Sequence, residues 1–227
     1  MTIRPVSAIA SALAAPPPDG AIARRALLST TELACRRGDR LLFCGLDFEV
    51  RAGDVVWLRG ANGCGKTSLL RVLVGLARAA EGRLDRDGAA GHAIYIGHAN
   101  ALKDDLTALE ALQFLARMQG LPADAEACAA ALRRFGVHGR RHAMVRTLSQ
   151  GQRRRVALAR LLLAPAQSLW MLDEPFDALD TDGCATLREA LAAHARGGGA
   201  VVLTSHLDPG LHDPEPAVVQ LDEVAAR

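Results

Sequence analysis

The sequence predicts an α/β fold of two lobes, in which a buried parallel sheet carries a flanking antiparallel β-ribbon and a helical insertion. Three apolar stretches predict the sheet, and they lie at residues 55–58, 168–172 and 201–203. Aliphatic runs without polar alternation are typical of strands that are buried on both faces. A glycine-rich loop, an acidic pair and a histidine follow these three runs, and such residues at the ends of strands predict a ligand site.

Length and composition exclude several classes of protein. The 227 residues correspond to one large domain or to one domain with a sizeable insertion. Half of the residues are apolar and the net charge is +2, so neither disorder nor strong attraction to nucleic acid is indicated. The longest apolar runs, at 7–15 and 161–172, are shorter than the roughly 20 residues of a membrane-spanning helix. The five cysteines include no C-x-x-C pair, which argues against zinc or a disulfide framework and favours a reducing compartment.

The chain begins with an Ala- and Pro-rich stretch, residues 1–25, which we interpret as a disordered extension. A weak signal peptide is the alternative interpretation. The folded domain is expected at 26–227. Within it, residues 28–33 and 41–50 predict two strands of a small antiparallel ribbon, and turn residues then lead into the first buried strand.

A glycine-rich loop follows that strand and precedes a helical pattern. It reads GANGCGKT at residues 60–67, which is the G-x-x-x-x-G-K-[ST] pattern in the strand-to-helix context that it requires. The glycines let backbone N–H groups surround phosphate oxygens, and the helix N-terminus adds positive potential. Lys66 is expected to reach the β- and γ-phosphates of a nucleotide, and Thr67 to bind Mg²⁺. Cys64, next to a lysine and a helix N-terminus, is expected to have thiolate character. The candidate nucleotide-binding residues are Gly60, Ala61, Asn62, Gly63, Cys64, Gly65, Lys66, Thr67 and Ser68.

Two acids, Asp173 and Glu174, end the second buried strand. Neighbouring side chains at a strand end point in opposite directions, so they do different work. We expect Asp173 to hold Mg²⁺ through water, and Glu174 to be the general base that polarises the attacking water. Together with the phosphate loop, this pair predicts a site that hydrolyses ATP.

A second anion site is predicted where the sequence LSQGQ, residues 148–152, opens an amphipathic helix. Ser149 and Gly151 offer a hydroxyl and N–H donors at the helix N-terminus, although a plain helix cap is the alternative interpretation. Because one phosphate loop already serves the β- and γ-phosphates, a second site implies another ATP. We therefore expect a head-to-tail homodimer with two ATP molecules between its subunits. Two of the three arginines that follow, at 153–155, are expected on a solvated helix face.

The order of these motifs resembles the ATP-binding cassette (ABC) ATPases over roughly residues 28–221. The resemblance implies an ABC-type P-loop ATPase with a RecA-like core, an antiparallel β-ribbon subdomain and an α-helical subdomain. It also implies a separate integral membrane permease subunit as partner. His206 would contact the γ-phosphate, and Asp180 would belong to the D-loop. The residues that the resemblance adds to the site are Ser149, Gly151, Gln152, Asp180 and His206.

Two positions depart from the family pattern. The aromatic residue that stacks on adenine is missing; Arg37 is the candidate in its place and Phe43 the alternative. A glutamine that touches the metal follows the strand at 93–96 in the family, whereas this chain reads GHAN there. Asn100 is the candidate metal contact, His98 is its alternative, and a third possibility is that the contact is absent.

The segment YIGHANALK at residues 95–103, followed by LTALE at 106–110, is similar to the ATPase subunits of cytochrome c maturation transporters, described as haem exporters. This resemblance implies a peripheral protein on the cytoplasmic face of the bacterial inner membrane. It would energise haem export or the release of a haem-loaded partner. The chain itself is not expected to bind haem, because its seven histidines are scattered and no C-x-x-C-H is present.

A capping box of Thr107 and Glu110 predicts a helix to residue 119, and a second helix is expected at about 123–135. The helical subdomain would span about 99–160 and, as in related ATPases, dock onto the membrane subunit.

Three other functions stay open: the ATPase of another small-substrate exporter, a soluble ABC regulatory ATPase, or a module that binds ATP without hydrolysis. The short interval between Lys66 and Asp173 leaves no room for the coiled-coil arm of DNA-acting relatives.

Overall fold

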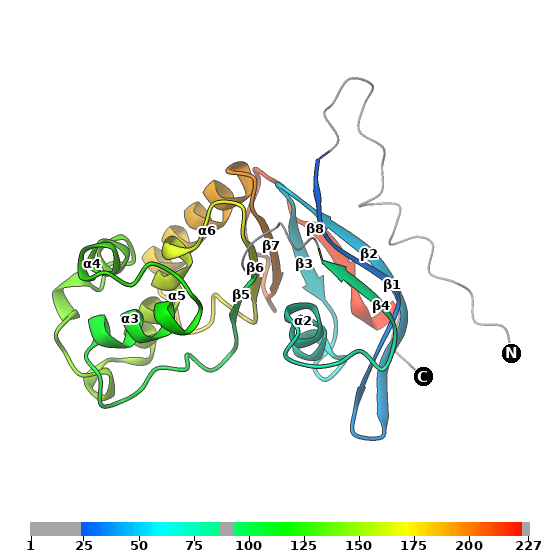
Figure 1. Cartoon of the computed structure of the whole chain (residues 1–227), viewed down its shortest axis with the longest axis horizontal. Helices are drawn as coiled ribbons and strands as arrows, with labels where there is room; N and C mark the ends of the chain where they lie inside the picture. The colour runs from blue at the N-terminus through cyan, green and yellow to red at the C-terminus, as the bar shows by residue number, and fades with distance from the viewer. Residues whose placement is uncertain (1–23, 87–92, 224–227) are drawn as a thin grey trace, which may run out of the picture.

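The computed structural model describes residues 24–86 and 93–223. Over these residues the chain forms a five-stranded parallel sheet, a three-stranded antiparallel sheet and helices. Figure 1 shows the parallel sheet in the middle, with the antiparallel sheet on one side and most of the helices on the other. The extension expected at residues 1–25 lies almost wholly outside the described residues.

The parallel sheet has the strand order β5-β6-β7-β3-β8. Every residue of β6 and of β7 is buried, as the uninterrupted apolar runs predict. The three strands expected from those runs are confirmed as β3, β6 and β7. Because all neighbours in this sheet are parallel, their carboxyl ends meet at one edge. The strands are β3 (Val55–Arg59), β5 (Ala93–Ile96), β6 (Leu169–Leu172), β7 (Ala200–Thr204) and β8 (Ala217–Gln220).

The antiparallel sheet has the order β2-β1-β4. Its strands are β1 (Ala26–Arg37), β2 (Arg40–Arg51) and β4 (Glu81–Arg86). Strands β1 and β2 form the predicted ribbon, with Arg37 paired to Arg40 beside the turn. Strand β4 was not predicted, because five of its six residues are exposed and it carries no alternating pattern.

Helix α2 (Lys66–Val74) lies between the two sheets (Figure 1). Its buried residues Leu69, Leu70 and Leu73 join a core that includes residues of both sheets. Burial of each leucine contributes about 1.5–3 kcal/mol, so packing on two sides fixes where the helix begins. That start, at Lys66, directly follows Gly65, the last glycine of the glycine-rich loop.

The remaining helices pack around a second core on the other side of the parallel sheet. They are α3 (Ala108–Met118), α4 (Ala125–Arg134), α5 (Gln150–Ala159) and α6 (Thr181–Arg196). Short 3-10 helices cover His138–Arg140, Val145–Thr147, Arg160–Leu163 and Leu221–Glu223.

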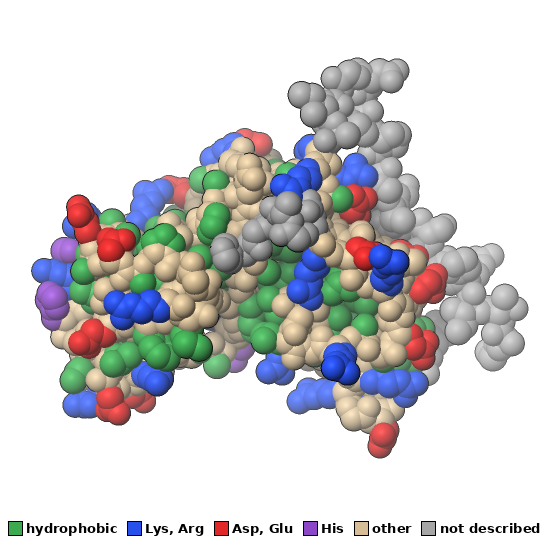
Figure 2. Space-filling view, viewed as in Figure 1, with side chains coloured by type: hydrophobic (Ala, Val, Ile, Leu, Met, Phe, Trp, Pro, Cys, Tyr) green, Lys and Arg blue, Asp and Glu red, His purple; other side chains and the backbone are tan. Residues whose placement is uncertain are grey.

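The predicted capping box is confirmed at the start of α3. The Thr107 hydroxyl accepts from the Glu110 N–H, and the Glu110 carboxylate accepts from the Thr107 N–H. Within the described part of the chain, no helix is long and apolar enough to cross a membrane. Positive and negative side chains are interspersed on the face that Figure 2 shows, in agreement with the net charge of +2.

Candidate functional site

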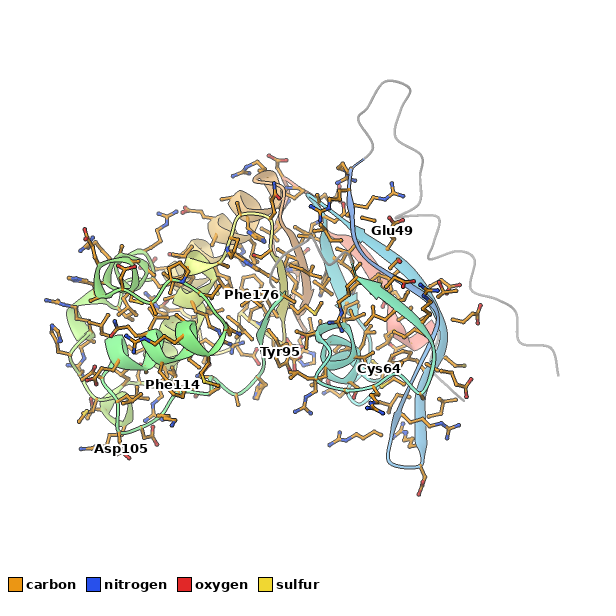
Figure 3. All side chains as sticks on the ribbon, viewed as in Figure 1. Glu49, Cys64, Tyr95, Asp105, Phe114 and Phe176 are labelled. Atoms are coloured by element: carbon orange, nitrogen blue, oxygen red, sulfur yellow. The ribbon has the colours of Figure 1, made fainter. Side chains whose placement is uncertain are left out.

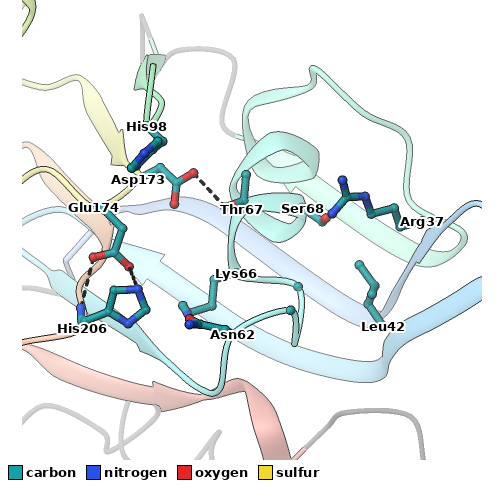
Figure 4. Close-up of a pocket in the computed structure, with 12 residues that line it drawn as sticks. Arg37, Leu42, Asn62, Lys66, Thr67, Ser68, His98, Asp173, Glu174 and His206 are labelled. Atoms are coloured by element: carbon teal, nitrogen blue, oxygen red, sulfur yellow. Dashed lines mark hydrogen bonds and ion pairs between the residues drawn. The ribbon is translucent and has the colours of Figure 1, made fainter. Parts of the chain in front are cut away.

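A cleft opens where the carboxyl ends of β6 and β7 face the glycine-rich loop (Figure 4). It brings together the phosphate loop, both acids and the histidine, which are far apart in the sequence. Its lining comprises Arg37, Leu42, Asn62, Gly63, Gly65, Lys66, Thr67, Ser68, His98, Asp173, Glu174 and His206. The predicted site residues outside this lining are Gly60, Ala61, Cys64, Asn100, Ser149, Gly151, Gln152 and Asp180.

The phosphate loop ends at Gly65, which has a left-handed φ of 113° and begins helix α2. A Cβ at this position would lie 3.1 Å from the Cβ of Leu42 and 3.2 Å from the Phe43 ring, so glycine lets β2 pack against the loop. No side chain caps the first turn of α2. Uncapped N–H groups at a helix N-terminus, reinforced by the helix dipole, are suited to bind phosphate oxygens.

Lys66 is folded back onto its own loop. Its Nζ donates to the carbonyl of Gly60 at 2.7 Å and to that of Ala61 at 3.2 Å. The side chain still lines the cleft. The ammonium group is therefore held in the loop by acceptors that phosphate oxygens can replace.

A chain of hydrogen bonds joins the loop to both acids. The Thr67 hydroxyl donates to Asp173 Oδ2 at 2.8 Å, and the Thr204 hydroxyl donates to Asp173 Oδ1 at 2.9 Å. The Thr204 oxygen also accepts from the backbone N–H of Glu174 at 2.8 Å. Asp173 is 4% exposed and Thr204 is fully buried, so the linkage is rigid.

Thr204 is a site residue that sequence reasoning missed. It stands in the strand that ends at the histidine, and no role was assigned to it. The parallel pairing of Leu172 with Leu203 places the next residue of each strand, Asp173 and Thr204, side by side. The position of Thr204 beside Asp173 therefore depends on the register between two strands, which the local sequence does not reveal.

Glu174 and His206 lie next to each other on one side of the cleft (Figure 4). The Glu174 carboxylate accepts from the His206 N–H at 3.1 Å, and its other oxygen lies 3.5 Å from His206 Nε2. Glu174 is 9% exposed and has a φ of 48°, a left-handed conformation that costs a non-glycine residue energy. Strain held at a cleft carboxylate is typical of a functional position.

The structure separates the candidates for stacking on the base and for contacting the metal. Arg37 lines the cleft, whereas Phe43 is fully buried in the core and has no free face for a base. His98 also lines the cleft, while the side chain of Asn100 accepts from Arg154 at 3.2 Å outside the lining. The geometry therefore favours His98 over Asn100 as the side chain that a bound metal or water would meet.

The LSQGQ segment at residues 148–152, here called the signature segment, lies away from this cleft, and it opens α5, here called the signature helix. Ser149 caps α5 through a reciprocal pair of bonds with Gln152, so the capping interpretation of this segment holds in the isolated chain. Asp180 caps α6 by accepting from the Gly183 N–H at 2.9 Å, and it also bonds to Arg155. The Gly183 bond and then Arg155 lower the pKa of Asp180.

The expectation of a reactive thiolate at Cys64 is wrong. The side chain is 9% exposed and packs on Gly60, where a Cβ would come within 2.7 Å of the sulfur (Figure 3 shows its position). Burial raises the pKa of the Cys64 thiol; Lys66 opposes this, and Asp222 adds to it. Desolvation thus outweighs the nearby ammonium group.

The arginine triplet is less solvated than expected. The Arg153 and Arg155 side chains retain 34% and 15% exposure and donate to backbone carbonyls. Arg154 is buried and contacts the backbone of both acids. A run of three like charges gave no indication of which member points inward.

Comparisons with known proteins identify the family of the chain. A family model described as ABC transporter matches residues 43–177. The cytochrome c biogenesis ATP-binding export protein CcmA of Aromatoleum aromaticum is 46% identical over 209 residues, which are 88% of this chain and 97% of that protein. The protein of the same description from Pseudomonas putida (strain KT2440) is 49% identical over 188 residues, 79% of this chain and 89% of the relative.

Two solved structures resemble the fold. One is described as an ATP-binding subunit of an ABC transporter, and it matches with a TM-score of 0.70 at 27% identity over 80% of each chain. The other is a putative ABC transporter ATP-binding protein from Pyrococcus furiosus, with a TM-score of 0.75 over 88% of this chain and 99% of that one. At 21% identity the second likeness supports the fold alone.

Proposed function

The chain belongs to the ABC transporter family, and from this premise we propose that it is the ATP-hydrolysing subunit of a transport complex that serves cytochrome c biogenesis. The family and the fold class predicted from the motifs are confirmed. The observation that carries the proposal is the continuous linkage from Thr67 through Asp173 and Thr204 to Glu174, opposite the phosphate loop.

The phosphate loop and Lys66 bind the nucleotide. The N–H groups at the start of α2 hold the phosphate oxygens, and Lys66 exchanges its carbonyl acceptors for the β- and γ-phosphates. Arg37 stacks on the base from the turn between β1 and β2. Leu42 lines the cleft next to Gly65 of the loop.

The oxygen donors beside the phosphate loop fit Mg²⁺. Thr67 and Asp173 offer a hydroxyl and a carboxylate, the hard ligands that this ion takes alongside phosphate oxygens. They are the residues that would hold it, with His98 nearby. When bound, Mg²⁺ neutralises charge on the β- and γ-phosphates. In the described ranges no group of three His, Cys, Asp or Glu side chains forms a metal site, and nucleotide-bound Mg²⁺ does not require one.

Glu174 is the general base of the hydrolytic step. Its carboxylate accepts a proton as the water oxygen attacks the γ-phosphorus, and the bond from that phosphorus to the β-γ bridging oxygen breaks to leave ADP and phosphate. The backbone N–H of His206 orients the carboxylate, and the imidazole contacts the γ-phosphate.

A second copy of the chain completes each site. Ser149, Gly151, Gln152 and Asp180 lie outside the cleft of their own chain, so a head-to-tail homodimer would present them to the partner's nucleotide. Bound ATP then holds the two chains in a closed dimer, and hydrolysis of ATP lets the dimer open. This cycle of closing and opening drives the attached membrane subunits.

Membrane subunits of a cytochrome c maturation complex are the proposed partners, because the described relatives are cytochrome c biogenesis export proteins. The chain would bind peripherally at the cytoplasmic face of the inner membrane, with its helical lobe (about 99–160) against the membrane subunit. We expect ATP hydrolysis to drive haem export or the release of a haem-loaded partner. The ATPase itself would not bind haem.

Two variants test the ATPase assignment. Lys66→Ala is expected to abolish ATP binding, measured by calorimetry; unchanged affinity would contradict the phosphate-loop assignment. Glu174→Gln is expected to bind ATP without hydrolysing it and to accumulate as dimers in light scattering. A variant that stays monomeric at saturating ATP would contradict the shared-site proposal.

A pull-down from detergent-solubilised membranes tests the partner. Recovery of haem-handling cytochrome c maturation membrane proteins, identified by mass spectrometry, is the expected result. Recovery of another permease would retain the ATPase chemistry and refute the haem assignment.

A further inference from the structure

Arg154 makes an unusually complete set of hydrogen bonds for a buried cation. It lies on α5, two residues after Gln152, and is 2% exposed. Its Nη2 donates to the carbonyls of Asp173 and Glu174 at 3.1 and 2.7 Å, and its Nε to that of Pro175 at 3.4 Å. Its Nη1 donates to the Gly97 carbonyl at 2.9 Å and to the Asn100 side chain at 3.2 Å. Each of the five guanidinium N–H groups can therefore have an acceptor.

These acceptors belong to two segments, and the arginine connects both of them to a third, its own helix α5. Residues 173–175 follow β6, residues 97–100 follow β5, and the arginine itself stands on the helix that the signature opens. The fork geometry of guanidinium spans such a set, whereas an ammonium group has only three donors. Arg154 therefore fixes the signature helix relative to both strand ends.

The contact with residues 173–175 explains how the strained backbone of Glu174 is held. Three successive carbonyls converge on one guanidinium, and the left-handed φ of 48° at Glu174 lies within that turn. Such a conformation costs on the order of 1–3 kcal/mol and persists where surrounding contacts impose it. On the other side of the turn, the N–H of Glu174 is held by Thr204.

Charge does not account for the position of Arg154 by itself. Burial lowers its pKa, while Asp177, Asp173 and Glu174 act in the opposite direction. Its direct partners are backbone carbonyls and one amide oxygen, which define geometry more than they neutralise charge. The Arg154 guanidinium therefore acts mainly by holding the backbone in place, although burial of its charge is unfavourable.

We propose that Arg154 is a positioning residue for hydrolysis: it couples the placement of the signature helix and of segment 97–100 to the backbone that aims the Glu174 carboxylate. The inference rests on the proposed ATPase function. It implies that a shift of α5 or of segment 97–100 changes the hydrolytic rate without changing how tightly ATP binds.

Arg160 provides a matched control on the same helical stretch. It is 5% exposed and donates to the Tyr95 carbonyl at 2.8 Å, but it contacts neither acid. Replacement by lysine at either position removes a buried guanidinium and leaves a cation. Both variants therefore lose a buried guanidinium, but only Arg154→Lys loses the link to Glu174.

The test compares Arg154→Lys with Arg160→Lys for kcat, the KM for ATP and the midpoint of urea unfolding. Arg154→Lys is expected to lower kcat by about tenfold or more while KM changes by less than about threefold, because loss of positioning affects the transition state rather than binding. Arg160→Lys is expected to lose less stability, because Arg160 makes one hydrogen bond where Arg154 makes five, and to keep kcat within about threefold of the wild type. Equal kcat in the two variants, or a parallel loss of kcat and binding in Arg154→Lys, would overturn the inference.

A double-mutant cycle with Glu174→Gln gives a second measurement. If Arg154 acts through Glu174, Arg154→Lys adds no further loss to the residual single-turnover hydrolysis of Glu174→Gln. Additive losses would refute the coupling. Should Arg154→Lys not fold, Arg154→Gln, which retains an amide donor, takes its place in both experiments. An inactive wild type would instead refute the proposed function and so is distinguishable from failure of this inference.

Discussion

Replacement of Thr204 by valine tests the linkage between the two acids. Valine has the shape of threonine without the hydroxyl, so the buried strand β7 keeps its packing while two hydrogen bonds disappear. The backbone N–H of Glu174 and one oxygen of Asp173 lose their partner in a region closed to water. Asp173 retains its bond from Thr67.

The cost follows from those two groups. A buried donor left without an acceptor costs about 1–3 kcal/mol, and loss of one further bond adds about 1 kcal/mol, so Thr204→Val should lose roughly 2–4 kcal/mol of unfolding free energy. With a urea m-value of about 2 kcal/mol/M, the midpoint falls by about 1–2 M. Because the Glu174 backbone loses the hydrogen bond that holds it, the rate of ATP hydrolysis should fall more than the affinity for ATP.

Urea unfolding followed by circular dichroism and steady-state phosphate release measure both effects. Thr204→Ser is the control, because it retains the hydroxyl and loses one methyl group. A Thr204→Val midpoint equal to that of Thr204→Ser, with unchanged hydrolysis, would refute the argument that this hydroxyl holds the two acids in place.

Three other outcomes are expected. Burial against Trp170 lowers the pKa of His194 from an ordinary 6.5 to about 4. Between these two pH values His194 is mostly protonated in the unfolded chain and mostly neutral in the folded chain. The free energy of unfolding should therefore fall by about 2 kcal/mol between pH 7 and pH 5, and His194→Gln should remove this dependence in urea titrations. Maleimide should react slowly with Cys64 at pH 7 and faster above pH 9, because its pKa is raised, and ATP should protect it. Arg37→Ala should raise the KM for ATP by about three- to fivefold with little change in kcat, as expected for loss of an exposed stacking contact.

The expectations for Cys64 and Arg37 each have a further control. Asp222→Asn removes a carboxylate that raises the pKa of Cys64, so alkylation should accelerate; an unchanged rate would contradict the pKa argument. Arg36→Ala alters the neighbouring arginine, whose side chain is not part of the cleft lining, and should leave KM unchanged. An equal effect of the two arginine variants would remove Arg37 from the base site.

Much of the fold could be predicted because its signals are local. The buried strands β3, β6 and β7 are uninterrupted apolar runs, and the capping box at Thr107 marks a helix start within four residues of sequence. The polar edge strand β4 has no such signal, since its pairing with β1 satisfies the backbone while its side chains remain exposed.

Site residues that belong to a sequence motif were predicted. Site residues whose positions depend on tertiary contacts were missed. Lys66, Asp173 and Glu174 follow from loop and strand-end patterns. Thr204 depends on the register of two parallel strands, and Arg154 on the rotation of α5 about its axis. The protonation of Cys64 depends on burial, which a neighbouring lysine in the sequence does not reveal.

Phosphate release by the chain in complex with its membrane partner tests the central claim most directly. The account predicts steady hydrolysis of ATP by the wild-type complex, and almost complete loss in Glu174→Gln although that variant still binds ATP. A wild-type complex that binds ATP and releases no phosphate, or a Glu174→Gln complex that hydrolyses at the wild-type rate, would contradict it.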